Sequence, residues 1–258
     1  MIGVFGGSGF YQLLTEARSE DLTTPYGPPS SPPMVGSVEG TEVAFIARHG
    51  TNHEFPPHLI PYRANLWAMR ELGVGRIIAP TAVGSIYSAY APGEFVIPDQ
   101  LVDRTWGRAH TFFEGPETHH IPFADPYCPD LRSKAAAAVR ATVGVVHEGG
   151  TTVVVQGPRF STRAESTAFA DSGWHLLNMT QLPEAALARE LGICYANIAV
   201  VTDYDVGVPG EVPPVTHEEV LERFAEALDT LRTILFRLVP EADGPRSLPC
   251  DCAAGAPA

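Results

Sequence analysis

The chain has 258 residues, and its 17 lysines and arginines against 30 aspartates and glutamates leave a formal net charge of −13. A chain this acidic is a poor partner for the phosphate backbone of a nucleic acid and for an anionic membrane surface, so both partners are disfavoured. Small anions are not excluded, because they respond to the local charge of a site rather than to the net charge. Lys134 is the only lysine, so a cationic site would have to use arginine.

The length fits one large α/β domain or two small ones, and the low fraction of charged residues indicates a large buried area. Charged residues make up 18% of the chain, below the roughly 25% that is typical. The longest apolar run, near 198–201, is far shorter than the roughly 20 residues that span a bilayer, and the first ten residues lack the basic start of a signal peptide. We therefore expect a cytoplasmic protein with one domain over residues 1–240 and a flexible tail, rich in Ala, Gly and Pro, over 241–258.

Strand-like and helical segments alternate from the first residues to about residue 240. Apolar and β-branched runs predict strands at 1–5, 43–47, 76–80, 94–97, 151–156, 174–178 and 193–201. Apolar spacing and stop signals predict helices at 62–71, 129–142, 163–171, 182–191 and 216–239, the last beginning with a capping box of Thr216 and Glu219. Residues 20–42 are expected to form a proline-rich loop, and residues 104–129 an irregular segment. The alternation predicts a single α/β domain around a largely buried sheet.

Polar side chains that suit an anion follow three of the predicted strands. Ser8 lies in the glycine-rich turn after the first strand, and Arg48 and His49 end the second. Thr81 follows the third strand. Glycine N–H groups, hydroxyls and guanidinium groups all donate hydrogen bonds to anions, and this edge of an α/β sheet is where ligands bind. Together the four side chains predict a phosphate site, although each cluster alone also fits a tight turn or a surface ion pair.

Two aspartates follow the most strand-like run in the chain. Asp203 and Asp205 are two residues apart, so in extended chain their side chains point to the same side. Carboxylates that are close together and partly buried raise each other's pKa. A protonated carboxyl there would donate to a ring nitrogen, and an ionised one would accept from an amino group. An ordinary Asp-rich turn is the alternative.

Met179 and Phe160 are candidates for contacts with the flat or apolar faces of a ligand. Met179 lies between Asn178 and Thr180 at the end of a predicted strand, and methionine suits the face of a sugar or a base. Phe160 follows the strand at 151–156 and would stack on a base. Packing in the core is the alternative for both side chains.

The four cysteines fall into two groups. Cys128 and Cys194 are isolated in the sequence and are expected to be buried thiols. Cys250 and Cys252 form a C-D-C near the end, which lacks the spacing and the second pair of a typical zinc site. We expect a reduced, disordered tail there rather than a metal site, with a C-x-C disulfide as the alternative.

The clusters occur in an order that resembles the trimeric purine nucleoside phosphorylase family, and within it the 5′-methylthioadenosine phosphorylase branch. The resemblance covers about residues 1–240, and although no single motif is decisive, nine in the same order are specific. The matching segments are GGSGF at 6–10, ARHG at 47–50, YRANLWA at 62–68, TAVGS at 81–85, PGEFVIPDQLVDRT at 92–105, FADPYCP at 123–129, QGPRFSTRAES at 156–166, NMTQLPEA at 178–185 and the run 194–205.

The resemblance implies reversible phosphorolysis of a purine nucleoside, in which phosphate attacks C1′ of the ribose and a free purine leaves. It implies a central mixed sheet or barrel flanked by helices. It implies inorganic phosphate as co-substrate and no metal or organic cofactor. A homotrimer with each site at a subunit boundary is typical of the family.

The resemblance also assigns roles by position. Phosphate would be held by Ser8, Arg48, His49, Thr81, Ala82 and Thr180, the base and ribose by Phe160, Met179, Asp203 and Asp205, and the 5′ substituent by His53, His120, His217, Val220 and Leu221. Asp203 and Asp205 are the catalytic candidates, with Asp203 as general acid toward N7 of the purine. The 6-oxopurine branch has asparagine at the position of Asp203, so the aspartate favours adenine. His120 matches a position that reaches into the 5′ pocket of a neighbouring subunit.

His217 departs from the animal methylthioadenosine enzymes, in which this position is apolar and packs on the methylthio group. In 6-oxopurine phosphorylases a histidine there contacts the 5′-hydroxyl. A 5′-deoxy-5′-haloadenosine, adenosine or a 6-oxopurine nucleoside therefore stay open as alternatives to methylthioadenosine. A nucleoside hydrolase and a non-catalytic nucleoside-binding module are further alternatives, and the predicted phosphate site argues against the hydrolase.

Overall fold

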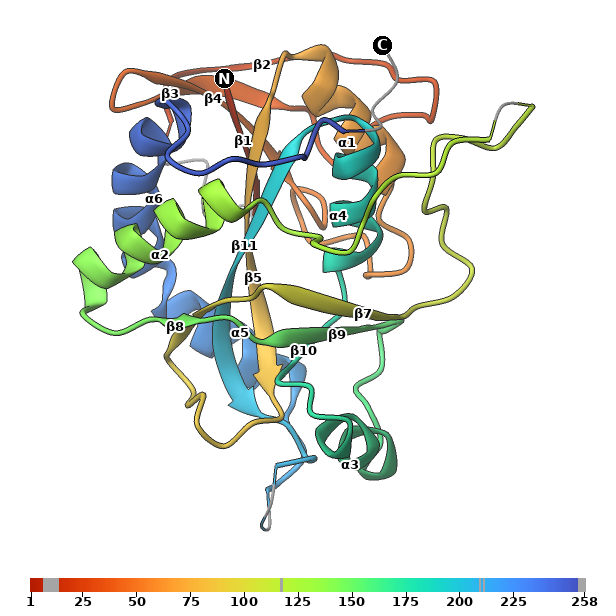
Figure 1. Cartoon of the computed structure of the whole chain (residues 1–258), viewed down its shortest axis with the longest axis vertical. Coiled ribbons are helices and arrows are strands. Elements are labelled where there is room, and N and C mark those ends of the chain that lie inside the picture. Colours follow the sequence, from red (N-terminus) through yellow and green to blue (C-terminus); the bar gives the residue numbers. More distant parts are fainter. Residues whose placement is uncertain (7–13, 117, 209, 211, 255–258) are drawn as a thin grey trace.

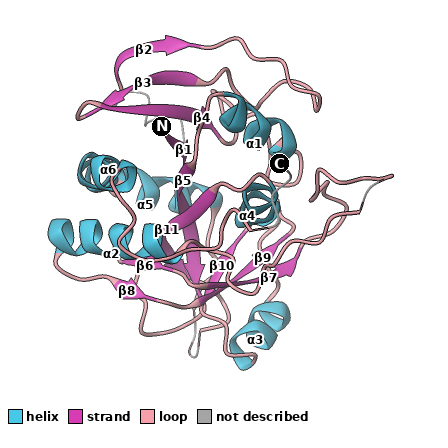
Figure 2. Cartoon of the chain, turned by 45° about the horizontal axis from the view of Figure 1, so that its top comes forward, coloured by secondary structure: helices cyan, strands magenta, loops and turns pink. Residues whose placement is uncertain are grey.

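The computed structural model describes the chain except residues 7–13, 117, 209, 211 and 255–258. The described residues form one mixed sheet flanked by helices, which confirms the predicted α/β fold (Figure 1 and Figure 2). The strands are β1 (Ile2–Gly6), β2 (Thr15–Ser19), β3 (Met34–Val38), β4 (Thr41–Ala47), β5 (Arg76–Ser85), β6 (Phe95–Ile97), β7 (Gln100–Arg104), β8 (His147–Glu148), β9 (Thr151–Val155), β10 (Leu176–Asn178) and β11 (Cys194–Tyr204). The helices are α1 (Tyr62–Glu71), α2 (Pro129–Val143), α3 (Arg163–Asp171), α4 (Gln181–Glu190), α5 (His217–Glu226) and α6 (Leu228–Asp243).

β5 and β11 form the longest pair of the sheet. They run parallel along their whole length, with one register shift between Val201 and Asp203. Figure 1 shows the two strands side by side along the centre of the molecule. β1 lies parallel between β4 and the first half of β5, and β10 pairs antiparallel with the last residues of β5. The carboxyl ends of β1 and β4 therefore come level with the middle of β5, where Thr81 lies.

Two apolar clusters cover the two faces of the sheet. α2 and α6 pack against each other, and Leu131, Ile198 and Leu235 belong to the core that they share with β11. α1 and α4 form the second helix pair, with Leu66 and Leu187 in its core. Figure 2 shows the two helix pairs on either side of the sheet. This burial holds the strand ends, and with them the polar clusters, in fixed positions.

The structure corrects the prediction of one helix over 216–239. α5 ends where the N–H of Ala227 donates to the carbonyl of Phe224, and α6 follows from Leu228. The two helices differ in environment, because α6 packs into the core while α5 has no buried residue. The capping box is confirmed: Thr216 Oγ1 accepts from the N–H of Glu219, and the Glu219 carboxylate accepts from the N–H of Thr216.

The sheet is also larger than the sequence predicts. β3 lies inside the expected loop at 20–42, because Val35 and Val38 are buried against the core. β5 continues past Pro80 to Ser85, since its partner β11 runs on beside it. The sequence does not predict β2, β7 and β8, because β2 is exposed along its length, β8 has two residues and β7 has no fully buried residue.

The chain after α6 lies against the body of the molecule in the described part. The backbone N–H groups of Ser247 and Leu248 donate to the carboxylate of Asp130, at the first turn of α2. The prediction that Cys128 and Cys194 are buried is confirmed, but they are not isolated, because Cys250 and Cys252 lie beside them. The sequence did not predict these contacts. Within the described residues, no helix combines the length and apolar character that crossing a membrane would take.

Candidate active site

One cavity of about 640 Å³ opens where the carboxyl ends of the central strands meet α5. Its walls come from the segment after β4, the second half of β5, the ends of β10 and β11, and α5. The predicted site residues that line it are Arg48, His49, His53, Thr81, Ala82, Phe160, Met179, Thr180, Asp203, Asp205, His217, Val220 and Leu221. The fold thus brings together side chains that are spread over most of the sequence.

Two predicted site residues are not among those walls. Ser8 lies outside the described residues, although β1 ends at Gly6, whose carbonyl accepts from the backbone N–H of Arg48. His120 is exposed in the irregular segment and does not line the cavity of its own chain.

Arg48 is held by a buried carboxylate that the sequence analysis did not select. Its Nε donates to Glu184 Oε2 at 2.8 Å and its Nη2 donates to Glu184 Oε1 at 2.9 Å. Its Nη1 donates to the carbonyl of Pro80 at 3.1 Å. Burial works against the charge of Arg48, but the pairing with Glu184 outweighs it and raises the pKa of Arg48 above its usual value. Described partners thus take three of the five guanidinium N–H bonds, and the others can serve a bound anion.

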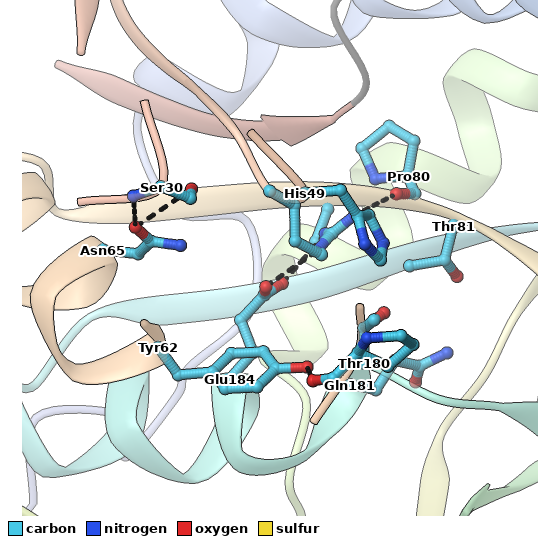
Figure 3. Close-up of polar contacts among 12 residues, drawn as sticks. Ser30, His49, Tyr62, Asn65, Pro80, Thr81, Thr180, Gln181 and Glu184 are labelled. Carbon is cyan, nitrogen blue, oxygen red and sulfur yellow. Dashed lines mark hydrogen bonds and ion pairs between the residues drawn. The ribbon is translucent and has the colours of Figure 1, made fainter. Parts of the chain in front are cut away.

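Glu184 fixes this arrangement from the core. Its side chain is 1% exposed, and its carboxylate also accepts from the hydroxyl of Tyr195 at 2.8 Å. The sequence shows only an acidic residue near the start of a predicted helix that also contains Arg189 and Glu190, and this does not reveal the partner. Figure 3 shows His49, Thr81 and Thr180 grouped on one side of Glu184, with Tyr62 and Asn65 on the other.

His49 presents an unprotonated nitrogen to the cavity region. Its Nδ1 lies 2.9 Å from the carbonyl of Phe55, and because a carbonyl only accepts, Nδ1 carries the proton. Burial lowers the pKa of His49 to about 4, and the neighbouring charge of Arg48 contributes to the shift. The ring is therefore neutral at physiological pH, and Nε2 is an acceptor suited to the hydroxyl of a protonated phosphate.

Two buried asparagines orient the hydroxyl and backbone donors near Arg48. Asn197 Nδ2 donates to the carbonyl of Ala79 at 2.6 Å and to Thr81 Oγ1 at 2.9 Å, so the Thr81 hydroxyl keeps its own proton for another acceptor. Asn178 Oδ1 accepts from the N–H of Thr180, and Asn178 Nδ2 donates to the carbonyl of Ala82. Arg48, His49, Thr81 and Thr180 are called the anion end of the cavity below.

Asp203 and Asp205 lie further along the same pair of strands. Asp203 pairs with Gly84 after the register shift in β11. Gly84 lies three residues beyond Thr81, which corresponds to about 10 Å along a strand. A Cβ at Gly84 would approach Asp203 Oδ2 to 3.1 Å, so the absence of a side chain there leaves room for the carboxylate. The distance along the strand between Thr81 and the partner of Asp203 fits a ligand made of a sugar joined to a flat ring.

The pKa values of both aspartates are raised. Burial raises the pKa of Asp203, the charges of Asp205 and Glu219 raise it further, and the hydroxyl of Thr202 opposes them, which leaves it at about 6. Burial also raises the pKa of Asp205, whose Oδ1 accepts from the N–H of Gly207 at 3.1 Å. A carboxyl of this kind is close to the protonation state that a general acid needs near neutral pH.

The wall near Met179 is held from behind by Arg108, which the sequence analysis missed. Arg108 is 8% exposed and donates to the carbonyls of Met179 and Gln156, at 2.9 and 2.7 Å. Gly157 has a φ of +62°, and a Cβ there would meet the sulfur of Met179 at 2.7 Å. Met179 and Phe160 are both half-buried and line the cavity, so neither is a core residue alone.

Three histidines form a row from the anion end toward α5. The rings of His49 and His53 stack at 4.4 Å between centroids, and the rings of His53 and His217 lie 5.9 Å apart. Burial and the neighbouring charge of His217 lower the pKa of His53. His217, Val220 and Leu221, called the α5 wall below, project from the first two turns of α5, and Leu221 is 46% exposed.

Comparison with known proteins gives three consistent results. Residues 1–240 match the phosphorylase superfamily. The chain is 59% identical over 209 residues to an S-methyl-5′-thioadenosine phosphorylase of Mycolicibacterium smegmatis, covering 81% of this chain and 78% of that protein. It is 48% identical to a purine nucleoside phosphorylase of Streptomyces coelicolor, over 98% of this chain and 94% of that protein.

Solved structures show the same architecture. A methylthioadenosine phosphorylase from an antarctic soil metagenomic library superposes with a TM-score of 0.91 at 37% identity, covering 99% of this chain and 90% of that chain. The methylthioadenosine phosphorylase of Schistosoma mansoni in complex with adenine superposes with a TM-score of 0.87 at 36% identity, covering 93% and 91% of the two chains.

Proposed function

The chain belongs to the phosphorylase superfamily, and we propose that it splits a 5′-modified adenine nucleoside with inorganic phosphate. The products are free adenine and a 5-substituted ribose 1-phosphate, and S-methyl-5′-thioadenosine is the favoured substrate. One observation carries the proposal: an anion end built around Arg48 and an aspartate pair with raised pKa values line the same cavity.

The reaction breaks the bond between C1′ and the purine nitrogen N9 while an oxygen of phosphate bonds to C1′. Positive charge develops on the ribose and negative charge on the purine. Phosphate at the anion end stabilises the first, held by N–H bonds of Arg48 and the hydroxyl of Thr81, while His49 accepts a hydrogen bond from the phosphate hydroxyl. Met179 lies along the ribose, on a wall that Arg108 supports.

Asp203 stabilises the leaving base. A protonated Asp203 donates to N7 of the purine, so the electron pair that N9 keeps from the broken bond to C1′ is accommodated in a neutral ring. With the proton shared, the carboxyl also accepts from the N6 amino group of adenine, whereas a 6-oxopurine places an acceptor there. Phe160 faces the same cavity and stacks on the base.

The α5 wall supplies the contacts to the 5′ substituent. Val220 and Leu221 offer apolar contact for a methylthio group, and His217 and His53 add polar groups beside them. This mixture favours a modified adenosine. It also makes adenosine and 5′-deoxy-5′-haloadenosines the substrates to compare with methylthioadenosine.

The proposal includes self-association as a homotrimer in which His120 of one subunit reaches the 5′ pocket of its neighbour. It is supported by the exposed position of His120 and by the lack of any buried residue in α5 of the single chain. Light scattering on the purified protein tests it, and a fully active monomer would contradict it. The cytoplasmic location, the absence of a cofactor from the reaction and a role in purine salvage stay predictions.

A substrate panel tests the proposed reaction. Release of adenine or hypoxanthine is followed for methylthioadenosine, adenosine, a 5′-chloro-5′-deoxyadenosine and inosine, each with phosphate and with sulfate as a matched tetrahedral anion. We expect phosphate-dependent release of adenine, fastest from methylthioadenosine. Equal release with sulfate would indicate a hydrolase, no release from any nucleoside would indicate a binding module, and preference for inosine would make it a 6-oxopurine phosphorylase.

A further inference from the structure

The four cysteines of the chain meet at one point, far from the cavity. Cys128 precedes the first turn of α2, Cys194 is the first residue of β11, and Cys250 and Cys252 follow α6. Their four sulfur atoms all lie within 4.8 Å of one another. In Figure 1 the chain after α6 runs across toward the start of β11, which brings the last pair to the first two.

The separation of the sulfur atoms matches a shared metal ion. Cys194 Sγ and Cys250 Sγ are 3.7 Å apart. Sulfur ligands of tetrahedral zinc lie about 2.3 Å from the metal, and hence about 3.8 Å from one another. All four cysteines are free in the structure, so each can offer a thiolate. Four thiolates around one point are the ligand set that selects zinc and other soft cations over magnesium or calcium.

The surroundings of the cluster suit a closed, negatively charged metal site. Cys128, Cys194 and Cys252 are at most 1% exposed and belong to the apolar core that α2 and α6 share. Arg246 Nη2 donates to Cys194 Sγ at 3.5 Å. This cation would offset part of the net negative charge of a complex of one zinc ion with four thiolates. The position of Cys128 at the amino end of α2 adds the favourable end of the helix dipole.

We propose that Cys128, Cys194, Cys250 and Cys252 bind one zinc ion in a structural site that fastens the C-terminal segment to the sheet. With four protein ligands the metal has no open position for a substrate or water, as in structural zinc sites. The cluster lies at the first residue of β11, nine residues before Asp203, which is about 30 Å in extended chain. The site therefore contributes to stability and takes no part in the reaction, and it stands independently of the proposed function.

Metal analysis of the full-length protein tests the proposal. The protein is purified under reducing conditions with added zinc, passed over a weak chelating resin, and analysed for metal and for thiols. We expect one zinc ion per chain that is released only when an organomercurial titrates the thiols. Replacement by cobalt should give the visible bands and the near-ultraviolet charge-transfer band of tetrahedral thiolate coordination.

Three variants separate the ligands from their neighbourhood. Cys250→Ser and Cys252→Ser should each lower the bound zinc at least tenfold and lower the Tm by several degrees. Cys250 is partly exposed, so its replacement carries less risk to folding than that of Cys252. Asp251→Asn, between the two cysteines and exposed, should keep the zinc and the cobalt spectrum of the wild type. Below the Tm, kcat/KM should be the same with and without zinc.

Other outcomes overturn the proposal. Four reactive thiols without retained metal would show a cluster of free cysteines, and an intact mass lowered by two hydrogens per pair would show disulfides instead. Zinc that survives in Cys250→Ser with an unchanged cobalt spectrum would place the metal elsewhere. A loss of kcat/KM on zinc removal in a protein that stays folded would contradict a purely structural role.

Discussion

The anion end and the α5 wall border the same cavity but are held in opposite ways. At the anion end Arg48 and Thr81 are each 4% exposed, and buried partners fix both side chains. On the α5 wall no residue of the helix is buried, and Leu221 is 46% exposed. Contacts within the single chain therefore fix the side chains of the anion end, but they leave those of the α5 wall largely exposed.

This difference indicates that the two ends have different roles in binding the substrates. The anion end is ordered by the core itself, so it is ready for phosphate before any substrate arrives. The α5 wall belongs to an amphipathic helix whose apolar side faces the cavity. A bound 5′ group or a neighbouring subunit would complete the burial of this side. Changes at the anion end should therefore affect folding and every substrate, whereas changes at the α5 wall should affect only the choice among 5′ substituents.

The largest effect should come from breaking the buried ion pair. Glu184→Gln leaves the Arg48 guanidinium without its charged partner, and both side chains are nearly inaccessible, at 5% and 1% exposed. Loss of one partner of such a pair costs about 3–5 kcal/mol. We expect a fall of that size in the free energy of unfolding, measured with urea, together with a large rise in the KM for phosphate.

A double variant separates stability from anion binding. Arg48→Met with Glu184→Leu removes both charges, so the stability should recover in part because apolar residues tolerate burial. Phosphorolysis should not recover with it. Activity restored to the wild-type level in the double variant would show that Arg48 does not hold phosphate.

The next largest effect should come from Asp203, which lines the same cavity as the two ends. Asp203→Asn removes the proton donor, and we expect kcat/KM for adenine nucleosides to fall about 100-fold or more. The ratio of adenosine to inosine activity should shift toward inosine, because an amide donates to a 6-oxo group. An unchanged ratio would contradict the assignment of Asp203 as the residue that selects the base.

The same variant gives a pH test. Burial raises the pKa of Asp203 from 3.8 to about 6, so ionising this carboxyl destabilises the folded protein. The free energy of unfolding is therefore highest with respect to this group below about pH 4, and it falls as the pH rises through 6. A shift of about two units corresponds to roughly 3 kcal/mol. Asp203→Asn should therefore be more stable than the wild type at pH 8 by up to that amount, and equally stable at pH 4. The wild-type kcat/KM should fall as the pH rises above about 6, and the variant should lack this limb.

A smaller and more selective effect is expected at the α5 wall. His217→Val replaces a polar ring by an apolar side chain, and a change of this size in a pocket alters discrimination by about tenfold. The ratio of kcat/KM for methylthioadenosine to that for adenosine should rise, while the KM for phosphate should not change. A profile identical to that of the wild type would exclude His217 from the 5′ pocket.

The smallest effect should come from the cap of α5. Thr216→Ala removes the hydroxyl that accepts from the N–H of Glu219, which is worth about 1 kcal/mol to the first turn of the helix. Because no residue of α5 is fully buried, the global free energy of unfolding should barely change, and the nucleoside KM should rise a few-fold. An equal rise in the KM for phosphate would show that the two ends of the cavity are not independent.

The sequence predicts much of this site because many of its polar side chains lie at or just after the ends of strands. The apolar runs that end before Arg48, Thr81 and Asp203 are visible without a structure and predict an α/β fold, which the observed sheet and helices confirm. The residues that sequence reasoning missed are the supporting ones. Glu184, Asn197 and Arg108 look like ordinary helix, strand and loop residues until their partners are known.

Hydrophobic periodicity and residue type are local properties, so they are enough to predict the fold class and the kinds of side chain in the cavity. Which of these side chains meet depends on the tertiary structure. Arg48 and Glu184 are 136 residues apart in the chain, and Cys194 and Cys250 are 56 apart. Such pairs depend on how the strands are ordered and on where the segment after α6 lies, which no local pattern encodes. The net charge of −13 likewise does not decide anion binding, which depends on the directed N–H donors of Arg48 and the hydroxyl of Thr81 at one place in the fold.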